Sequence, residues 1–257
     1  MDKLHMPTLR VLEVFKAIYD NEKGLTLTEI SRSTGIAKGT LHPIVATLLE
    51  KEYLESNGSF ISIGRGAFKL GYSYAHSLSY LYILKPHMRE IVTSCDEICQ
   101  LGILDGEDVL YIEKTEPKQA IRIESSAGKT IAAYATALGK CLLSGLTEKN
   151  ITILYPEKLF SYTANTVASR TGLLKTLQEV RKKGYAHEIG ETNIDIECLA
   201  VPIKIENKIQ AAISVSLPIF RSTPEKIEHI INVLRFHERA IETEISSLPG
   251  GIKLFSD

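Results

Sequence analysis

Hydrophobic positions in the first 51 residues repeat with helical spacing in three successive segments. Residues 7–20 carry a wide apolar stripe opposite a polar face. A second helix is predicted to begin at Thr26-Leu-Thr-Glu29, a capping box, and to end at Gly35. A third is predicted from Lys38 to Lys51. Two short helices joined by a tight turn with a glycine are typical of a helix-turn-helix, and an ordinary helical hairpin in a three-helix bundle is the alternative.

The pattern then changes from helix to strand. Residues 53–63 form two short alternating segments around Asn57-Gly58, which predicts a β-hairpin. Three helices followed by a hairpin indicate a winged helix, in which the third helix enters the major groove of DNA and the wing meets the backbone or minor groove. Pro43 removes one hydrogen bond from the third helix and is expected to bend it. The residues predicted to contact DNA are Thr28, Lys38, Gly39, Thr40, His42, Thr47, Asn57 and Ser59.

A connector follows this winged helix, which we assign to residues 1–65. Residues 66–84 read as one linker helix, and Pro86 is expected in the first turn of the next helix. The linker is richer in Tyr and Leu than a solvated helix should be. We interpret it as a dimer contact, because Tyr is enriched at interfaces, and packing against its own C-terminal domain is the alternative.

From residue 98 onward the hydrophobic period shortens to that of strands. The sequence predicts an α+β domain over residues 85–257, an antiparallel sheet covered by helices. The predicted strands are 98–104, 109–113, 120–125, 198–205 and 209–217, and the predicted helices are 136–143, 172–183 and 223–245.

Composition and charge indicate a globular protein but do not identify its binding partner. Hydrophobic residues make up 44% and charged residues 24% of the 257, the balance of a globular protein. Residues 1–75 hold nine Lys/Arg against eight Asp/Glu, a weak basic excess for a DNA-binding module. Phosphate attraction must therefore come from where the charges lie. No apolar run is long enough for a membrane span, and the first residues lack the pattern of a signal peptide. A cytoplasmic location without membrane contact is therefore expected.

Four cysteines, Cys95, Cys99, Cys141 and Cys198, are too few for a disulfide framework. Cys95 and Cys99 are four residues apart with His87 nearby, an arrangement that could bind a metal. Small packing residues are the preferred interpretation, since no second Cys/His pair completes a tetrahedral site. No metal and no cofactor are therefore expected.

A resemblance to IclR-type transcriptional regulators covers the chain. Their head domain is similar to the run LTLTEISRSTGIAKGTLHPIVATLLEKEYLE followed by ISIGRGAFKLG. Their C-terminal domain resembles AYATALGKCLLS, EVRKKGYAHEIGE, CLAVPI and AAISVSLP, in that order. The resemblance implies a GAF-like effector-binding domain, with double-stranded DNA and a small-molecule effector as partners. It also implies a homodimer, with a dimer of dimers as the larger assembly.

Three positions depart from the family pattern. Gly39 stands where the family usually has Ser, and Pro43 where it usually has an Arg that contacts DNA. Asp195 replaces the usual Gly ahead of the strand cysteine, so the lid of the pocket is expected to differ.

The same resemblance assigns an effector site to Ala137, Leu138, Glu188, Cys198, Ser214 and Ser216. The serines are two apart on a strand, so their hydroxyls face the same side. Backbone N–H groups near Ala137 suit an anion, which favours a small carboxylate. No Arg or Lys is expected to line the site, so the affinity should be of micromolar order. The alternative for the serines is packing inside the sheet with hydrogen bonds to the backbone.

Two other functions compete with regulation. An enzyme could use Cys198, His187 and Glu188 as nucleophile, base and orienting group. Adjacent strand residues point to opposite faces, however, and no nucleophile-elbow motif is present, so no catalytic residue is assigned. The other rival is a sensor or scaffold whose winged helix binds protein, which the weak basic charge and Pro43 keep open.

Overall fold

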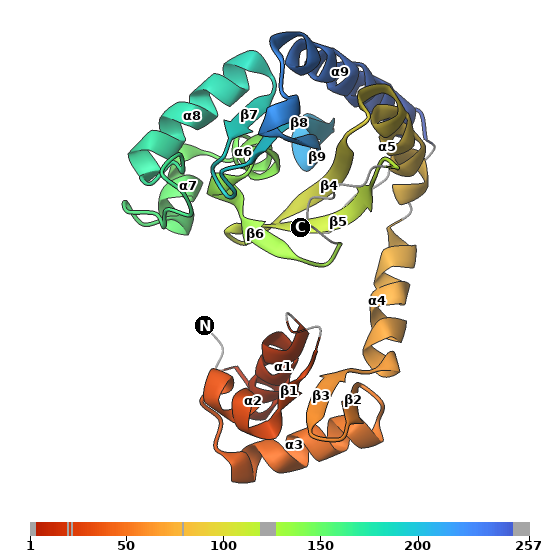
Figure 1. The fold of residues 1–257 in the computed structure, drawn as a ribbon, viewed down its shortest axis with the longest axis vertical. Coiled ribbons are helices and arrows are strands. Elements are labelled where there is room, and N and C mark those ends of the chain that lie inside the picture. The colour runs from red at the N-terminus through yellow and green to blue at the C-terminus, as the bar shows by residue number, and fades with distance from the viewer. Residues whose placement is uncertain (1–3, 20, 22, 79, 119–126, 249–257) are drawn as a thin grey trace. The chain divides into compact units, whose positions relative to one another are not determined.

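The computed structural model describes residues 4–19, 21, 23–78, 80–118 and 127–248, which fall into two compact units. The first unit is Met1–Leu78 and the second is Ser79–Asp257 (Figure 1). Each unit has its own fold, and the two together give the mixed helix and sheet content that the sequence predicts. None of the helices within the described residues is both long and apolar enough to span a membrane.

The head unit is the predicted helix-turn-helix with a wing. The capping box is confirmed: Thr26 Oγ1 accepts from the Glu29 backbone N–H at 3.3 Å, and Glu29 Oε2 accepts from the Thr26 N–H at 2.8 Å. Gly35 ends the second helix in the left-handed region. Its elements are α1 (Met6–Tyr19), β1 (Leu25–Thr26), α2 (Leu27–Thr34), α3 (Lys38–Glu50), β2 (Leu54–Asn57), β3 (Phe60–Ile63) and α4 (Arg65–Ser77).

The small sheet of the head has the order β1-β3-β2. The turn of the wing is Gly58-Ser59, one position beyond the predicted Asn57-Gly58, because Asn57 still pairs with Phe60. Gly58 has a φ of 68°, a backbone conformation that glycine adopts without strain. The core of the head holds apolar side chains from α1, α2, α3 and the two strands of the wing: Val14, Ile18, Ile30, Leu41, Val45, Leu54 and Ile61.

The predicted single linker helix over 66–84 is wrong. Helix α4 ends with Leu78 as its C-terminal cap, and α5 (Leu81–Cys95) begins after Tyr80. The prediction failed because the apolar run continues across the break. Pro86 consequently lies in the interior of α5, not in its first turn.

The C-terminal unit is built on an antiparallel sheet of order β6-β5-β4-β9-β8-β7 within the described residues. Helices α5 and α9 cover one face, and α6, α7 and α8 lie on the other (Figure 1). The strands are β4 (Ile98–Asp105), β5 (Asp108–Thr115), β6 (Thr130–Ala132), β7 (Ala186–Ile189), β8 (Ile196–Ile205) and β9 (Lys208–Pro218). The helices are α6 (Ala137–Leu143), α7 (Glu148–Leu154), α8 (Arg170–Lys183) and α9 (Pro224–Ser246), with short 3₁₀ turns at Ala133–Ala135 and Ile219–Arg221.

Most of the predicted elements of this domain are present, and some are additional. The strand expected over 120–125 lies outside the described residues. Strands β6 and β7 and helix α7 were not predicted.

Helix α6 folds closely back on the turn before it. A Cβ at Gly139 would lie 2.1 Å from the Ala133 carbonyl oxygen, so only glycine fits there.

Alternation along β8 and β9 sorts their residues between the two faces. Cys198 and Ala200 pack with the core formed with α6 and α8. Ser216 is paired with Cys198, and Ser214 with Ala200, so both serines share that face. The intervening positions, such as Leu199 and Val215, are buried toward α5 and α9. The sheet thus presents a line of small and polar residues to α6.

Candidate DNA interface and effector site

The surface of the head carries the residues that were predicted to contact DNA. Lys38, His42 and Thr47 are exposed on α3, and Thr40 is half-buried. A side chain at Gly39 would meet nothing within 4 Å. Thr28 on α2 and Asn57 and Ser59 on the wing are exposed as well. The structure places all eight predicted residues where a ligand could reach them.

Helix α3 runs through Pro43 without interruption. Proline has no N–H for the Gly39 carbonyl, and Thr47 Oγ1 donates to the Pro43 carbonyl oxygen at 2.7 Å. The Thr47 hydroxyl is therefore already engaged in a bond to its own helix.

The charges near the start of α3 suit a phosphate despite the weak basic excess of the head. The first turn of α3 holds Lys38 and no acidic residue, and Ala37 provides no side-chain cap. The helix dipole adds positive potential there. Two head carboxylates are engaged elsewhere, Glu29 in the capping box and Glu52 with Arg65.

Polar side chains on the α6 face of the large sheet form a chain of hydrogen bonds. The Cys198 thiol donates to Ser216 Oγ at 3.1 Å, and that hydroxyl donates to Gln100 Oε1 at 2.9 Å. Ser214, Ser216 and Gln100 are all buried. The hydroxyl of Ser216 thus bonds a side chain and not the backbone, and Gln100 is a participant that sequence reasoning missed.

Glu188 lies beside this series of hydrogen bonds, because its partner across strands β7 and β8 is Cys198. Burial raises the pKa of Glu188 to about 7, although the Glu191 backbone N–H, the Cys198 thiol and Lys140 each lower it. The Glu191 N–H donates to Glu188 Oε2 at 2.9 Å. Near neutral pH this carboxyl therefore exchanges a proton, and in its protonated form it can donate a hydrogen bond.

The expectation that no Lys or Arg lines the site is wrong. Lys140 on α6 is 1% exposed and forms an ion pair with Glu191. Its charge also acts on Glu188. A lysine inside the apolar run ATALGKCLL was the signal in the sequence, since lysine is rarely buried without a partner.

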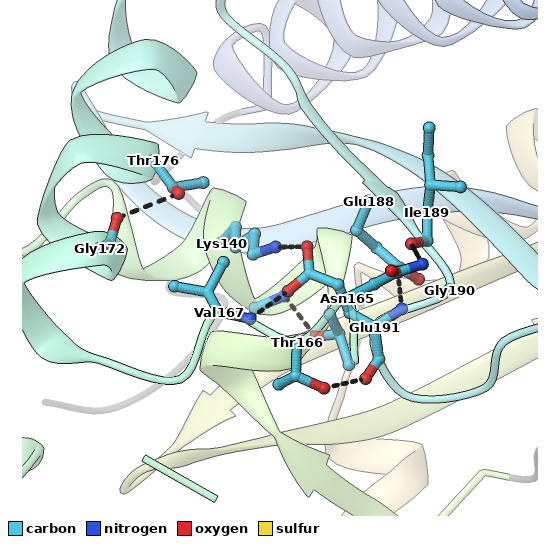
Figure 2. Close-up of polar contacts among 12 residues, drawn as sticks. Lys140, Asn165, Thr166, Val167, Gly172, Thr176, Glu188, Ile189, Gly190 and Glu191 are labelled. Carbon is cyan, nitrogen blue, oxygen red and sulfur yellow. Dashed lines mark hydrogen bonds and ion pairs between the residues drawn. The ribbon is translucent and has the colours of Figure 1, made fainter. Parts of the chain in front are cut away.

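The Glu191 segment is fastened to the loop that precedes α8, as Figure 2 shows. Glu191 Oε2 accepts from the Val167 N–H at 3.3 Å, and Thr166 Oγ1 donates to the Glu191 carbonyl at 2.6 Å. Asn165 Nδ2 donates to the Ile189 carbonyl at 3.2 Å. Through these bonds the buried charges of Lys140 and Glu191 hold two loops together.

The other predicted effector residues lie against the same face. Ala137 and Leu138 are buried at the start of α6. A Cβ on Gly102 would come within 3.3 Å of Leu138, so this helix start sits directly over β4. Tyr111, which sequence reasoning missed, is paired with Gly102; burial raises its pKa, and the charges of Cys198 and Glu188 raise it further.

A thiol-dependent site is not assembled. His187 Nε2 lies 2.6 Å from Glu197 Oε1, on the face of the sheet opposite to Glu188 and Cys198. Burial also raises the pKa of the Cys198 thiol, which disfavours the nucleophilic thiolate.

Comparison with known proteins identifies the family of both units. Residues 8–58 match the IclR helix-turn-helix domain and residues 72–243 match the bacterial transcriptional regulator IclR C-terminal domain. The helix-turn-helix match implies DNA binding. The chain is 31% identical to the HTH-type transcriptional regulator XynR of Escherichia coli over 80% of its own length and 84% of that protein.

Two solved structures share the fold. An IclR transcriptional regulator from Alicyclobacillus acidocaldarius is 24% identical, with a TM-score of 0.84 over 94% of this chain and 99% of that chain. An IclR homologue from Microbacterium hydrocarbonoxydans, complexed with 4-hydroxybenzoate, is 21% identical, with a TM-score of 0.81 over 94% and 100%. The relatives are transcriptional regulators and not enzymes, as predicted. The chain belongs to the IclR family of bacterial transcriptional regulators.

Proposed function

We propose that this regulator binds a small carboxylate metabolite on the α6 face of its C-terminal unit, and that the ligand changes the affinity of the head for operator DNA. The observation that supports this proposal most is that four polar side chains lie together on one buried face of the sheet: Glu188, Cys198, Ser216 and Gln100. Desolvating polar groups is costly, so such a cluster in a core favours a binding role. A structural relative that holds 4-hydroxybenzoate supports a carboxylate.

The chemistry of the cluster also favours a carboxylate of modest affinity. Serine hydroxyls and a protonated Glu188 can donate hydrogen bonds to carboxylate oxygens. Lys140 already forms an ion pair with Glu191, so its charge is not available to pair with the ligand. A dissociation constant of micromolar order, about −8 kcal/mol, is therefore expected. Allosteric coupling of ~1–3 kcal/mol would shift operator affinity by about 5–150-fold.

The double variant Ser214→Ala with Ser216→Ala should bind the ligand more than about 100-fold more weakly, since it removes two hydrogen bonds to a charged group that contribute ~1.5–3 kcal/mol each. DNA binding without ligand should be unchanged. Calorimetry with 4-hydroxybenzoate and a panel of small carboxylates measures the effect. Ser144→Ala is the matched control, because that serine is also buried but donates to the Cys141 carbonyl. Equal ligand affinity in the double variant and the wild type would place the site elsewhere.

For the head, we propose that α3 and the wing read double-stranded DNA as part of a homodimer, with a dimer of dimers as the larger assembly. The apolar surface of α4 supports the dimer: Phe68 is 70%, Tyr72 57% and Tyr74 50% exposed. Aromatic residues are enriched at protein interfaces. A dimer of this kind would contact two half-sites about one helical turn apart.

Lys38→Ala should weaken binding to every DNA sequence and flatten the salt dependence by roughly one unit, as loss of one phosphate contact predicts. A mobility-shift assay on the DNA upstream of the chain's own gene, over a series of salt concentrations, measures both. Lys16→Ala on α1 is the control for loss of an exposed charge and should change neither. His42→Ala should alter sequence preference more than affinity.

Two results would contradict this assignment. A changed sequence preference in Lys38→Ala would mean that Lys38 reads a base. A wild-type chain that shifts no DNA at any salt concentration would leave a protein partner for the winged helix.

A further inference from the structure

Two histidines face each other between the first and last helices of the C-terminal unit. His87 on α5 and His237 on α9 are 150 residues apart in sequence, yet their Nδ1 atoms lie 2.9 Å apart. Glu90 follows one turn after His87 on α5. One donor atom from each of His87, Glu90 and His237 lies within 4.8 Å of the other two. This cluster contains His87, which the sequence had offered as a metal ligand together with Cys95 and Cys99, but it includes neither cysteine.

The donor set is suited to a divalent transition metal. Two imidazoles and one carboxylate bind zinc in many proteins and leave a fourth position for water. With Zn–N distances of ~2.0–2.1 Å in a tetrahedral site, the two nitrogens would lie about 3.3 Å apart. The rings therefore need to separate by only about 0.4 Å. Nitrogen ligands disfavour Mg²⁺ and Ca²⁺, which prefer oxygen.

The surroundings of the cluster resemble those of metal-binding histidines. His87 Nε2 lies 3.3 Å from Glu244 Oε2 on α9, and a histidine that ligates a metal usually donates its other ring N–H to such a carboxylate. His237 is 5% exposed, and its neighbours along α9, Leu234 and Ile241, are buried. This packing fixes the ring, while exposed Glu90 leaves the cluster open to solvent.

We propose that His87, Glu90 and His237 bind one divalent transition-metal ion, with Zn²⁺ as the best match, and that Glu244 orients His87. The ion would fasten α5 to α9 on the face of the sheet opposite to the effector site. The site therefore stands independently of the proposed ligand. Its consequence is a C-terminal unit whose stability depends on the metal, because an ion that binds only the folded state stabilises it.

The test uses the full chain without a histidine tag, stripped with a chelator. Zn²⁺ is titrated in competition with a chromophoric chelator, and thermal unfolding is followed with and without Zn²⁺. The wild type should bind one ion per chain and unfold at a higher temperature when it is bound. His87→Gln should weaken Zn²⁺ affinity by more than about 100-fold, and Glu244→Gln by ~10–100-fold.

His229→Gln is the matched control. His229 also joins α9 to α5, through Nε2 at 3.2 Å from Ser94 Oγ, but it is not part of the cluster. This variant should keep the wild-type Zn²⁺ affinity. His87 is chosen over the more deeply buried His237 so that the variant folds. The proposal is overturned if the stripped wild type takes up no stoichiometric Zn²⁺, or if His87→Gln binds Zn²⁺ as tightly as the wild type.

Discussion

Lys140→Met should lower the free energy of unfolding by about 3–5 kcal/mol, the cost of removing one partner from a buried ion pair. The loss arises from Glu191, whose side chain is only 9% exposed and would keep a charge without its cation. Because Glu191 also accepts from the Val167 N–H, the loop before α8 should loosen as well. Urea unfolding of the variant and the wild type at one pH measures the difference.

The partner variants distinguish a lost charge pair from lost packing. Glu191→Leu alone should also lower the free energy of unfolding, since it leaves the buried charge of Lys140 without its partner. The double variant Lys140→Met with Glu191→Leu should recover much of the stability, because two apolar groups can replace a buried pair at little cost. A loss below about 1 kcal/mol in Lys140→Met would mean that the pair behaves like a solvated surface pair.

Deleting residues 1–78 should abolish DNA binding and leave a folded C-terminal unit. The cut falls between the two compact units, and the second retains its whole sheet and its own core. A cut at residue 85 would instead remove the start of α5, where Leu81, Ile83 and Leu84 are buried. Mobility-shift assays report the loss, and circular dichroism with thermal unfolding reports the fold. If the shortened chain still shifts operator DNA, the head is not the DNA-binding unit.

Local patterns predicted the elements that are long or that are bounded by clear turn or capping residues. The strands 198–205 and 209–217 were predicted on either side of the polar run Glu206-Asn207-Lys208. The structure places the turn at Glu206 and Asn207, which both have the positive φ that a tight hairpin requires, and Lys208 already pairs with Ile205. Strands β6 and β7 have three and four residues, too few to establish a period. The break at Leu78 was hidden because apolar residues continue on both sides of it.

The parts of the sites that were missed depend on partners far along the chain. Lys140 and Glu191 are 51 residues apart, and His87 and His237 are 150 apart. Periodicity reports whether a position is buried, but it carries no information on which distant residue lies opposite. The alternation of Ser214 and Ser216 was visible for the opposite reason, since it lies within one strand.

The sheet order has a consequence for how this protein folds during synthesis. Strand β9 lies between β4 and β8, so β4 remains an open edge until residues 208–218 have been made. Pairing of Gln100 with Ser214 then closes a loop of more than a hundred residues. Contacts so distant in sequence form slowly, and an unpaired strand edge invites association with other chains. The C-terminal unit should therefore complete its fold only after β9 has been made, when the head can already be folded.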